Sequence, residues 1–376
     1  MDWEQLRRNE FPIAERFAYF DHAAVSPLPR RAGDMLRTWA DEQERFGVVH
    51  WPNWGRKLES IRRDAARLIN ADIDEIAFIN NTTHGIGLVA EGFPWQPGDT
   101  VVSAEEEYPS NLYPWLNLES RGVVLRTVPS REGRIWLRDL AAAIDRTTRL
   151  VTISHVEFAS GFRNDLDDLA DLCHARGVAL FVDAIQGLGP HVIDVQRTPI
   201  DFLAADGHKW LLGPEGAGIL FVRRPWIERL RPIGVGWHSV VGSFNASGID
   251  FRLKPNAQRW EGGSPNMPGL QAFGASLSLL LEIGPETVSR RILEQAERVR
   301  AAAEAAGWQV YGSDRPEDRS GIVALERAGV DPHQVVQSLR TRGVVVACRR
   351  GRLRVSPHVY NNGDDLERLA DGLRDV

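Results

Sequence analysis

Two short segments of this chain carry side chains that could do covalent chemistry. Asp183 closes an apolar run at residues 179–183, and Lys209 follows the next apolar run, at residues 202–204. A lysine amine in apolar surroundings has its pKa lowered by desolvation, which favours Schiff-base formation with an aldehyde. A carboxylate beside a pyridine nitrogen keeps that nitrogen protonated, so that the ring can accept electrons. The pair therefore indicates pyridoxal phosphate (PLP) chemistry.

Each of these residues alone has an ordinary structural explanation. A lysine in a Gly-His-Lys turn is usually solvated, and an aspartate after a strand commonly caps a helix. Lys209 is followed by the apolar sequence Trp-Leu-Leu-Gly, however, and Gln186 lies one short turn beyond Asp183. The combination is specific evidence for PLP chemistry, whereas each residue alone is weak evidence.

The elements that must position this pair can be predicted from hydrophobic patterning. Between residues 76 and 225, β-branched apolar runs alternate with helix-like segments. Near-continuous hydrophobicity is typical of strands buried on both faces, and the intervening helices predict a mostly parallel sheet. Residues 165–176 repeat Leu or Ala at helical spacing, begin acidic and end at Gly177, which predicts a helix. The predicted strands span 76–79, 100–103, 123–128, 150–154, 179–182, 202–204 and 218–222.

The pattern changes after about residue 285. A long charged helix at 286–306 precedes short strands and further helices, which together predict a compact α+β unit. We expect two domains around one active site. The expected parts are an N-terminal segment (1–25) that packs with the small domain, a large PLP-binding domain (26–260) and a small α+β domain (261–376).

Composition narrows the function classes. The net charge of −6 over 376 residues comes with no Lys/Arg-rich block, so we expect no nucleic-acid partner. The longest apolar runs, such as 276–283, are too short for a membrane span, and the first residues lack the pattern of a signal peptide. Two cysteines, Cys173 and Cys348, make neither a disulfide framework nor a zinc site, and no metal is expected. We expect a soluble, cytoplasmic enzyme with a small-molecule substrate.

Several motifs occur in an order that resembles a known family. They are Tyr-Phe-Asp-His-Ala-Ala-Val-Ser-Pro at 19–27, Asn-Thr-Thr-His-Gly-Ile at 81–86, Ser-His-Val at 154–156, the Asp183 and Lys209 segments, Glu-Gly-Gly-Ser-Pro-Asn at 261–266, and Arg-Val-Ser-Pro-His-Val-Tyr-Asn at 354–361. With these motifs the chain resembles the class V aminotransferases. That family includes cysteine desulfurases, selenocysteine lyases, kynureninases and isopenicillin-N-epimerase-like proteins. The resemblance implies an α/β fold of fold-type I, with a mostly parallel seven-stranded sheet flanked by helices and a smaller α+β C-terminal domain.

The resemblance also implies roles around the PLP ring. Lys209 would form the Schiff base and then shuttle the proton at the substrate Cα. Asp183 would pair with the pyridine nitrogen, and Gln186 would hydrogen-bond the phenolic oxygen. Tyr108 falls where relatives place a ring stacked on the cofactor, although a core tyrosine at a strand end is the ordinary alternative.

Four further residues are implied at the phosphate and at a subunit boundary. Thr83 and His84 would receive the phosphate at the start of a helix, where free N–H groups and the helix dipole favour an anion. His208 would add a phosphate contact. Ser264 matches a residue that reaches the phosphate of the neighbouring subunit, so we expect a homodimer, although an ordinary turn serine is a strong alternative.

Arg354 is the expected substrate residue. Its planar guanidinium suits an α-carboxylate held by two parallel hydrogen bonds. The alternative is a solvated strand arginine, which its neighbours Arg349, Arg350 and Arg352 support. The match of residues 354–361 to the carboxylate-binding segment of the family favours substrate binding.

The chain departs from its relatives at three positions. Cysteine desulfurases carry a longer loop with a nucleophilic cysteine before the substrate arginine, and residues 344–354 leave no room for it. Cys348 lies nearby, where flanking arginines could lower its pKa, but a structural cysteine is the preferred interpretation. Phe158 replaces an asparagine near the phenolic oxygen. Asp206 replaces a serine near the phosphate, where a carboxylate is repulsive unless it is protonated or turned away.

We therefore expect a PLP-dependent enzyme that acts at the α-amine and Cα of a small amino acid. With the sulfur-transfer loop missing, class V aminotransferase or epimerase-type chemistry is the main interpretation. The alternatives are a β-elimination like that of cysteine desulfurase or selenocysteine lyase, and a PLP-binding regulatory protein.

Overall fold

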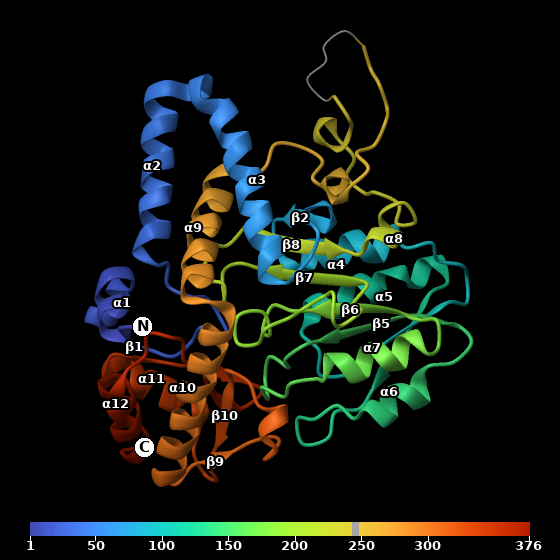
Figure 1. Ribbon diagram of the computed structural model, residues 1–376. Helices are drawn as coiled ribbons and strands as arrows, with labels where there is room; N and C mark the ends of the chain where they lie inside the picture. Colours follow the sequence, from blue (N-terminus) through green and yellow to red (C-terminus); the bar gives the residue numbers. More distant parts are fainter. Residues whose placement is uncertain (243–247) are drawn as a thin grey trace.

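The computed structural model describes residues 1–242 and 248–376, and its centre is a seven-stranded sheet (Figure 1). The strand order is β2-β8-β7-β6-β5-β3-β4. Strands β4, β3, β5, β6 and β7 pair in parallel, whereas β8 runs antiparallel to both β7 and β2. The strands are β2 (Ile76–Ile79), β3 (Thr100–Ala104), β4 (Val124–Val128), β5 (Thr148–Ser154), β6 (Ala179–Asp183), β7 (Phe202–Asp206) and β8 (Gly218–Val222). The predicted mostly parallel α/β sheet is confirmed.

Helices and two hydrophobic cores cover the faces of this sheet. Strand residues alternate between the cores: Leu180 and Val182 of β6 join one, and Ala179 and Phe181 join the other. Except for the edge strand β4, the strands are buried along most of their length, which explains their continuous hydrophobicity. The helices of this part are α4 (Thr82–Gly92), α5 (Tyr113–Leu116), α6 (Leu137–Ala143), α7 (Leu166–His174) and α8 (Arg224–Ile227).

A pair of long helices projects from the sheet and packs on a third. Helices α2 (Arg30–Phe46) and α3 (Trp51–Leu68) form a hairpin, and α9 (Met267–Ile283) lies against both (Figure 1). Because α9 follows residue 260 in the chain yet packs on helices from before it, the predicted boundary between residues 260 and 261 stays a prediction.

The C-terminal part is an α+β unit that also takes up the N-terminus. Its four-stranded antiparallel sheet has the order β12-β13-β10-β9. Strand β1 (Ala18–Tyr19) pairs in parallel with β11 (Val344–Val345), and Phe20 joins a third core with Trp308 and Leu353. The remaining elements are α1 (Trp3–Glu10), α10 (Pro285–Ala305), β9 (Gln309–Val310), β10 (Val323–Glu326), α11 (Pro332–Thr341), β12 (Ala347–Arg349), β13 (Arg352–Val355) and α12 (Gly363–Arg374).

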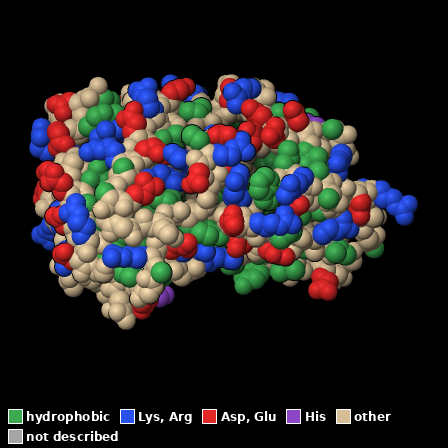
Figure 2. All heavy atoms as spheres, turned by 90° about the horizontal axis from the view of Figure 1, so that it is seen from below, with side chains coloured by type: hydrophobic (Ala, Val, Ile, Leu, Met, Phe, Trp, Pro, Cys, Tyr) green, Lys and Arg blue, Asp and Glu red, His purple; other side chains and the backbone are tan. Residues whose placement is uncertain are grey.

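The surface is mixed in charge. Seen from below, the Lys/Arg and Asp/Glu side chains are interspersed across the face that Figure 2 shows. Within the described ranges, no helix combines the length and the apolar composition that a membrane crossing requires. The same residues hold no group of three or more His, Cys, Asp or Glu side chains placed to bind a metal.

Candidate active site

The candidate site lies at the carboxyl ends of neighbouring parallel strands. Ser154, Asp183 and Asp206 are the last residues of β5, β6 and β7, and Ser154 is directly opposite Asp183 in the sheet. Open α/β sheets bind their ligands at this edge. A cavity of about 360 Å³ opens here, and its lining includes Thr83, Tyr108, Asp183, Gln186, His208, Lys209 and Arg354.

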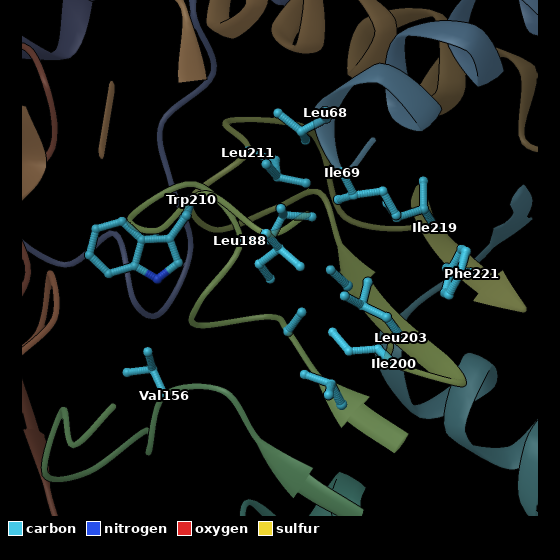
Figure 3. Packing of buried hydrophobic residues seen from close by; sticks show 14 of the residues in the cluster. Leu68, Ile69, Val156, Leu188, Ile200, Leu203, Trp210, Leu211, Ile219 and Phe221 are labelled. Carbon is cyan, nitrogen blue, oxygen red and sulfur yellow. The ribbon is translucent and has the colours of Figure 1, made fainter. Parts of the chain in front are cut away.

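Lys209 projects into this cavity from a loop that the core holds in place. The adjacent Trp210 and Leu211 are each only 1% exposed, and Figure 3 shows both in the cluster around Leu188. Burial lowers the pKa of Lys209 from 10.5 to about 8, and the nearby charge of Arg354 adds to the effect. The predicted apolar neighbourhood is therefore present, and it favours the neutral, nucleophilic amine.

Asp183 faces the same cavity from the end of β6 and is 2% exposed. Burial raises its pKa from 3.8 to about 6, although the Ile185 N–H, 3.1 Å from Oδ1, and the charge of Lys209 act in the opposite direction. A buried carboxylate of this kind is stabilised by a cationic partner. A protonated pyridine nitrogen would be such a partner.

The amide of Gln186 is oriented by two protein contacts. Its Oε1 accepts from the Trp210 indole at 2.8 Å, and its Nε2 donates to the Ala23 carbonyl at 3.0 Å. An amide nitrogen has two hydrogens, so one stays available for an acceptor in the cavity. The predicted contact with the phenolic oxygen would use that hydrogen, and it stays a prediction.

The start of α4 lies at one end of the cavity. Asn81 caps the helix by accepting from the His84 N–H at 2.8 Å, and Thr83 Oγ1 donates to Ser110 Oγ at 2.7 Å. Thr83 and Ser110 both line the cavity. The free N–H groups of the first turn suit a phosphate.

Asp206 is turned toward its own loop. Its Oδ1 accepts from the Gly207 N–H at 2.7 Å, and its Oδ2 lies 2.9 Å from His208 Nδ1. Both carboxylate oxygens thus face partners in the chain, although Asp206 still lines the cavity and its charge acts to raise the pKa of Lys209. The phosphate contact predicted for His208 stays a prediction.

Tyr108 and Phe158 stand together at the cavity. Their rings meet edge to face with centroids 5.2 Å apart, and the Tyr108 centroid lies 5.7 Å from Lys209 Nζ. Tyr108 is 46% exposed, which rules out the alternative of a core tyrosine. Stacking of Tyr108 on the cofactor stays a prediction.

Arg354 enters the cavity from β13 and is 1% exposed, so it is not a solvated strand arginine. Its guanidinium donates to Asp21 Oδ1 at 3.2 Å and to the Phe158 carbonyl at 3.0 Å. Burial lowers the pKa of Arg354 from 12.5 to about 10. A buried cation beside Lys209 is a suitable partner for a substrate carboxylate.

Ser264 and His84 line a second hollow of about 430 Å³, and neither lines the cavity of Lys209. Ser264 is exposed. Within one chain, the structure thus does not bring Ser264 or His84 to the cavity. Their predicted phosphate contacts, and the homodimer that Ser264 implies, stay predictions.

A buried ion pair anchors the segment that carries Ser264. Glu261 accepts the Phe78 N–H at 2.9 Å and pairs with Arg62, whose Nη2 lies 3.1 Å from Oε2. The side chains of Arg62 and Glu261 are 1% and 5% exposed. These contacts hold residue 261 against β2. They therefore fix the position from which residues 262–264 extend.

Sequence reasoning missed two buried carboxyl groups beside Asp183. Glu107 accepts from the Ser154 N–H at 2.6 Å and from Asn111 Nδ2 at 2.9 Å, and burial raises its pKa from 4.5 to about 7. Burial also raises the pKa of Glu157 well above its usual range. Glu107 closes a run of three glutamates, which in a sequence is typical of a solvated segment.

Neither Cys173 nor Cys348 lines the cavity of Lys209. Residues 350 and 351 form a two-residue turn with φ of 47° and 74° between β12 and β13, so the predicted absence of an inserted loop is confirmed. Cys348 Sγ lies 3.6 Å from His333 Nε2. Its pKa is raised rather than lowered, because burial outweighs the charge of Arg349. Cys173 is buried in α7.

Comparison with known proteins agrees with this geometry. A family model described as aminotransferase class-V matches residues 18–369. The chain belongs to this family. A probable cysteine desulfurase from Methanothermobacter thermautotrophicus is 30% identical over 399 residues, which cover 100% of this chain and 98% of the relative. An apo cysteine desulfurase from Thermococcus onnurineus NA1 superimposes with a TM-score of 0.89 at 25% identity, covering 99% of this chain and 97% of that one. A C-DES variant with glycine covalently linked to its PLP cofactor gives 0.92 at 22% identity, covering 98% and 99%.

This class V protein is therefore a PLP-dependent enzyme of fold-type I. The residues present fit the cofactor: Lys209 for its aldehyde, Asp183 for its ring nitrogen and the start of α4 for its phosphate. The relatives above are named as desulfurases, not as aminotransferases or epimerases. They favour the β-elimination that the sequence placed second over the aminotransferase or epimerase chemistry that it placed first.

Proposed function

We propose that this class V enzyme is a carbon–sulfur lyase. It would remove sulfur from a cysteine-type amino acid by β-elimination and release the sulfur without first binding it to a thiol of its own. The observation that carries the proposal is the two-residue turn at 350–351, which leaves no cysteine in the cavity lining among the described residues. Relatives named cysteine desulfurase, aligned over the whole chain, support cysteine as the substrate type.

Arg354 and Lys209 each have a defined task in this reaction. PLP, when bound, supplies the electron sink that makes the substrate Cα acidic. Arg354 holds the substrate carboxylate and so fixes Cα next to Lys209. The neutral amine of Lys209 takes the Cα proton, because its pKa of about 8 leaves a usable fraction unprotonated near neutral pH.

The reaction balances without an oxidant or a reductant. The Cβ–S bond breaks and its electron pair leaves with the sulfur. Water then converts the remaining three-carbon fragment to pyruvate and ammonia. A desulfurase that leaves alanine instead must pass its sulfur to a nucleophile, and the described cavity lining offers no thiol for that step.

Product analysis tests the proposal. We expect the enzyme to release pyruvate and reduced sulfur in equal amounts from a cysteine-type substrate, and Lys209→Ala to abolish both. Cys348→Ser should leave the rate unchanged, because that thiol lies outside the cavity lining. Alanine as the carbon product, a persulfide on Cys348, or conversion of the cofactor to pyridoxamine phosphate would each contradict the proposal.

A further inference from the structure

Two buried glutamates, Glu107 and Glu157, lie close to Asp183 but do not line the cavity. They are only 1% and 3% exposed. In the part of the chain that the structure describes, neither forms an ion pair with a Lys, Arg or His side chain. Because a buried carboxylate without a cation is costly, the two groups cannot both be ionised cheaply. Their hydrogen bonds indicate which of them carries the charge.

The hydrogen bonds of Glu107 suit an ionised carboxylate. Its Oε1 accepts from the Ser154 N–H at 2.6 Å, and its Oε2 accepts from the Ser154 hydroxyl at 2.5 Å and from Asn111 Nδ2 at 2.9 Å. The direction of the Asn111 bond is fixed, because Asn111 Oδ1 already accepts from Thr152 Oγ1 at 2.5 Å and from Trp115 Nε1 at 3.2 Å. Three donors thus converge on Glu107, and hydrogen bonds to the charged form stabilise it.

The surroundings of Glu157 suit a neutral carboxyl group instead. Its Oε1 accepts from Asn164 Nδ2 at 3.0 Å, whereas its Oε2 is buried and has no hydrogen-bond partner among the described residues. An ionised oxygen without a donor is costly to bury, and a protonated carboxyl avoids that charge. Burial, followed by the charge of Glu107, raises the pKa of Glu157 well above its usual range, which agrees with this assignment.

The central sheet places the charge of Glu107 near Asp183. Ser154, which donates twice to Glu107, is directly opposite Asp183 in the pairing of β5 with β6. Residues opposite each other in a sheet share a face, so the side chains of Ser154 and Asp183 are neighbours. The charge of Asp183 acts to raise the pKa of Glu107. Since this interaction is mutual, the charge of Glu107 also acts on Asp183 and on any cation paired with it.

We propose that Glu107 is a positioning residue that acts on the cofactor through Asp183, with Glu107 ionised and Glu157 holding a proton. A fixed negative charge beside Asp183 favours the protonated form of a pyridine nitrogen paired with that aspartate. The proton on Glu157 keeps a further negative charge out of the same buried region. The inference rests on the predicted contact of Asp183 with the ring nitrogen, and it holds whichever reaction follows.

Two forms of the cofactor separate this effect from folding and from catalysis. Deaza-PLP has a C–H in place of the ring nitrogen, so it keeps the aldehyde and the phosphate but cannot carry the ring charge. At pH 8 we expect the cofactor-free wild type to bind PLP more tightly than deaza-PLP, as measured from the absorbance of the bound cofactor. Glu107→Gln should reduce that preference about tenfold, which corresponds to one pKa unit of interaction.

The same substitution at Glu157 should have no such effect. An amide is as neutral as a protonated carboxyl, and its oxygen can still accept from Asn164, so Glu157→Gln should leave the preference for PLP unchanged. Glu105→Gln is the matched control, because it changes an exposed glutamate of the same run. Ser154→Ala removes one donor to Glu107 and should lower the preference by a smaller factor.

Infrared spectra of the holoenzyme give a readout of each charge state. The difference spectrum between the wild type and Glu157→Gln should contain the carbonyl stretch of a protonated carboxyl, and that for Glu107→Gln should contain the bands of a carboxylate. The reverse pattern overturns the proposal. An equal loss of affinity for PLP and deaza-PLP in Glu107→Gln also overturns it, because that result is expected of a purely structural residue.

Discussion

The buried amine of Lys209 should lower the stability of the apoprotein. The pKa of Lys209 falls from 10.5 to about 8 on folding, a difference of about 2.5 units. At 1.36 kcal/mol per unit, keeping this charge in the folded chain costs about 3 kcal/mol at pH 7. Lys209→Met keeps most of the side-chain volume without the charge, so it should raise the free energy of unfolding of the cofactor-free protein by up to about that amount.

The pH dependence of this difference provides a stricter test. Between about pH 8 and 10.5 the unfolded chain holds the Lys209 proton and the folded chain does not, so the stability of the wild type rises with pH. The advantage of Lys209→Met should therefore be full below pH 8 and vanish above about pH 10.5. Urea denaturation of the cofactor-free wild type and of the variant at several pH values measures it, with Lys57→Met as the control. A variant no more stable than wild type at pH 7, or a difference that does not change with pH, would refute the reasoning.

Two further substitutions probe other buried charges. Arg62→Ala leaves Glu261 buried without its cation, so thermal or urea denaturation should show a loss of roughly 3–5 kcal/mol; a loss below about 1 kcal/mol would show that the pair is solvated in solution. Asp21→Asn keeps an oxygen acceptor for Arg354 but removes the negative charge that competes with a substrate carboxylate. Steady-state kinetics should show KM falling by roughly threefold to tenfold, equivalent to about 1 kcal/mol, and a rise in KM would mean that Asp21 instead orients Arg354.

The sequence was most informative where a residue reports its own surroundings. The seven strands are found within about two residues of their predicted bounds, because buried parallel strands have continuous apolar runs. Lys209, Asp183 and Arg354 line one cavity, as the motifs implied. Asp183 and Lys209 face the same cavity because the strands that precede them, β6 and β7, are neighbours in the sheet. Ligand-binding side chains gather at the carboxyl ends of such strands.

The sequence was least informative about polar groups whose partners come from distant segments. The partners that orient Gln186 are Trp210 and the carbonyl of Ala23, neither of which a local pattern reveals. Glu107 follows two other glutamates, and only the fold shows that Ser154 and Asn111 bind it. The arginines beside Cys348 could have lowered its pKa, yet burial raises it, in keeping with the preferred interpretation of a structural cysteine. Each of these outcomes depends on tertiary contacts that a short sequence window does not contain.

The pairing of β1 with β11 has a consequence for how the active site is assembled during synthesis. The strand that ends in Asp183 and the loop that carries Lys209, between β7 and β8, are complete by residue 222, and these strands pair within one sheet. Asp21 and Arg354 instead meet across 333 positions of the chain, and the same ends are joined by a 2.6 Å ion pair between Arg7 and Asp365. Contacts of such long sequence separation form late. A nascent chain can therefore complete the cofactor half of its site on the ribosome, whereas the substrate half waits for the last helix to emerge.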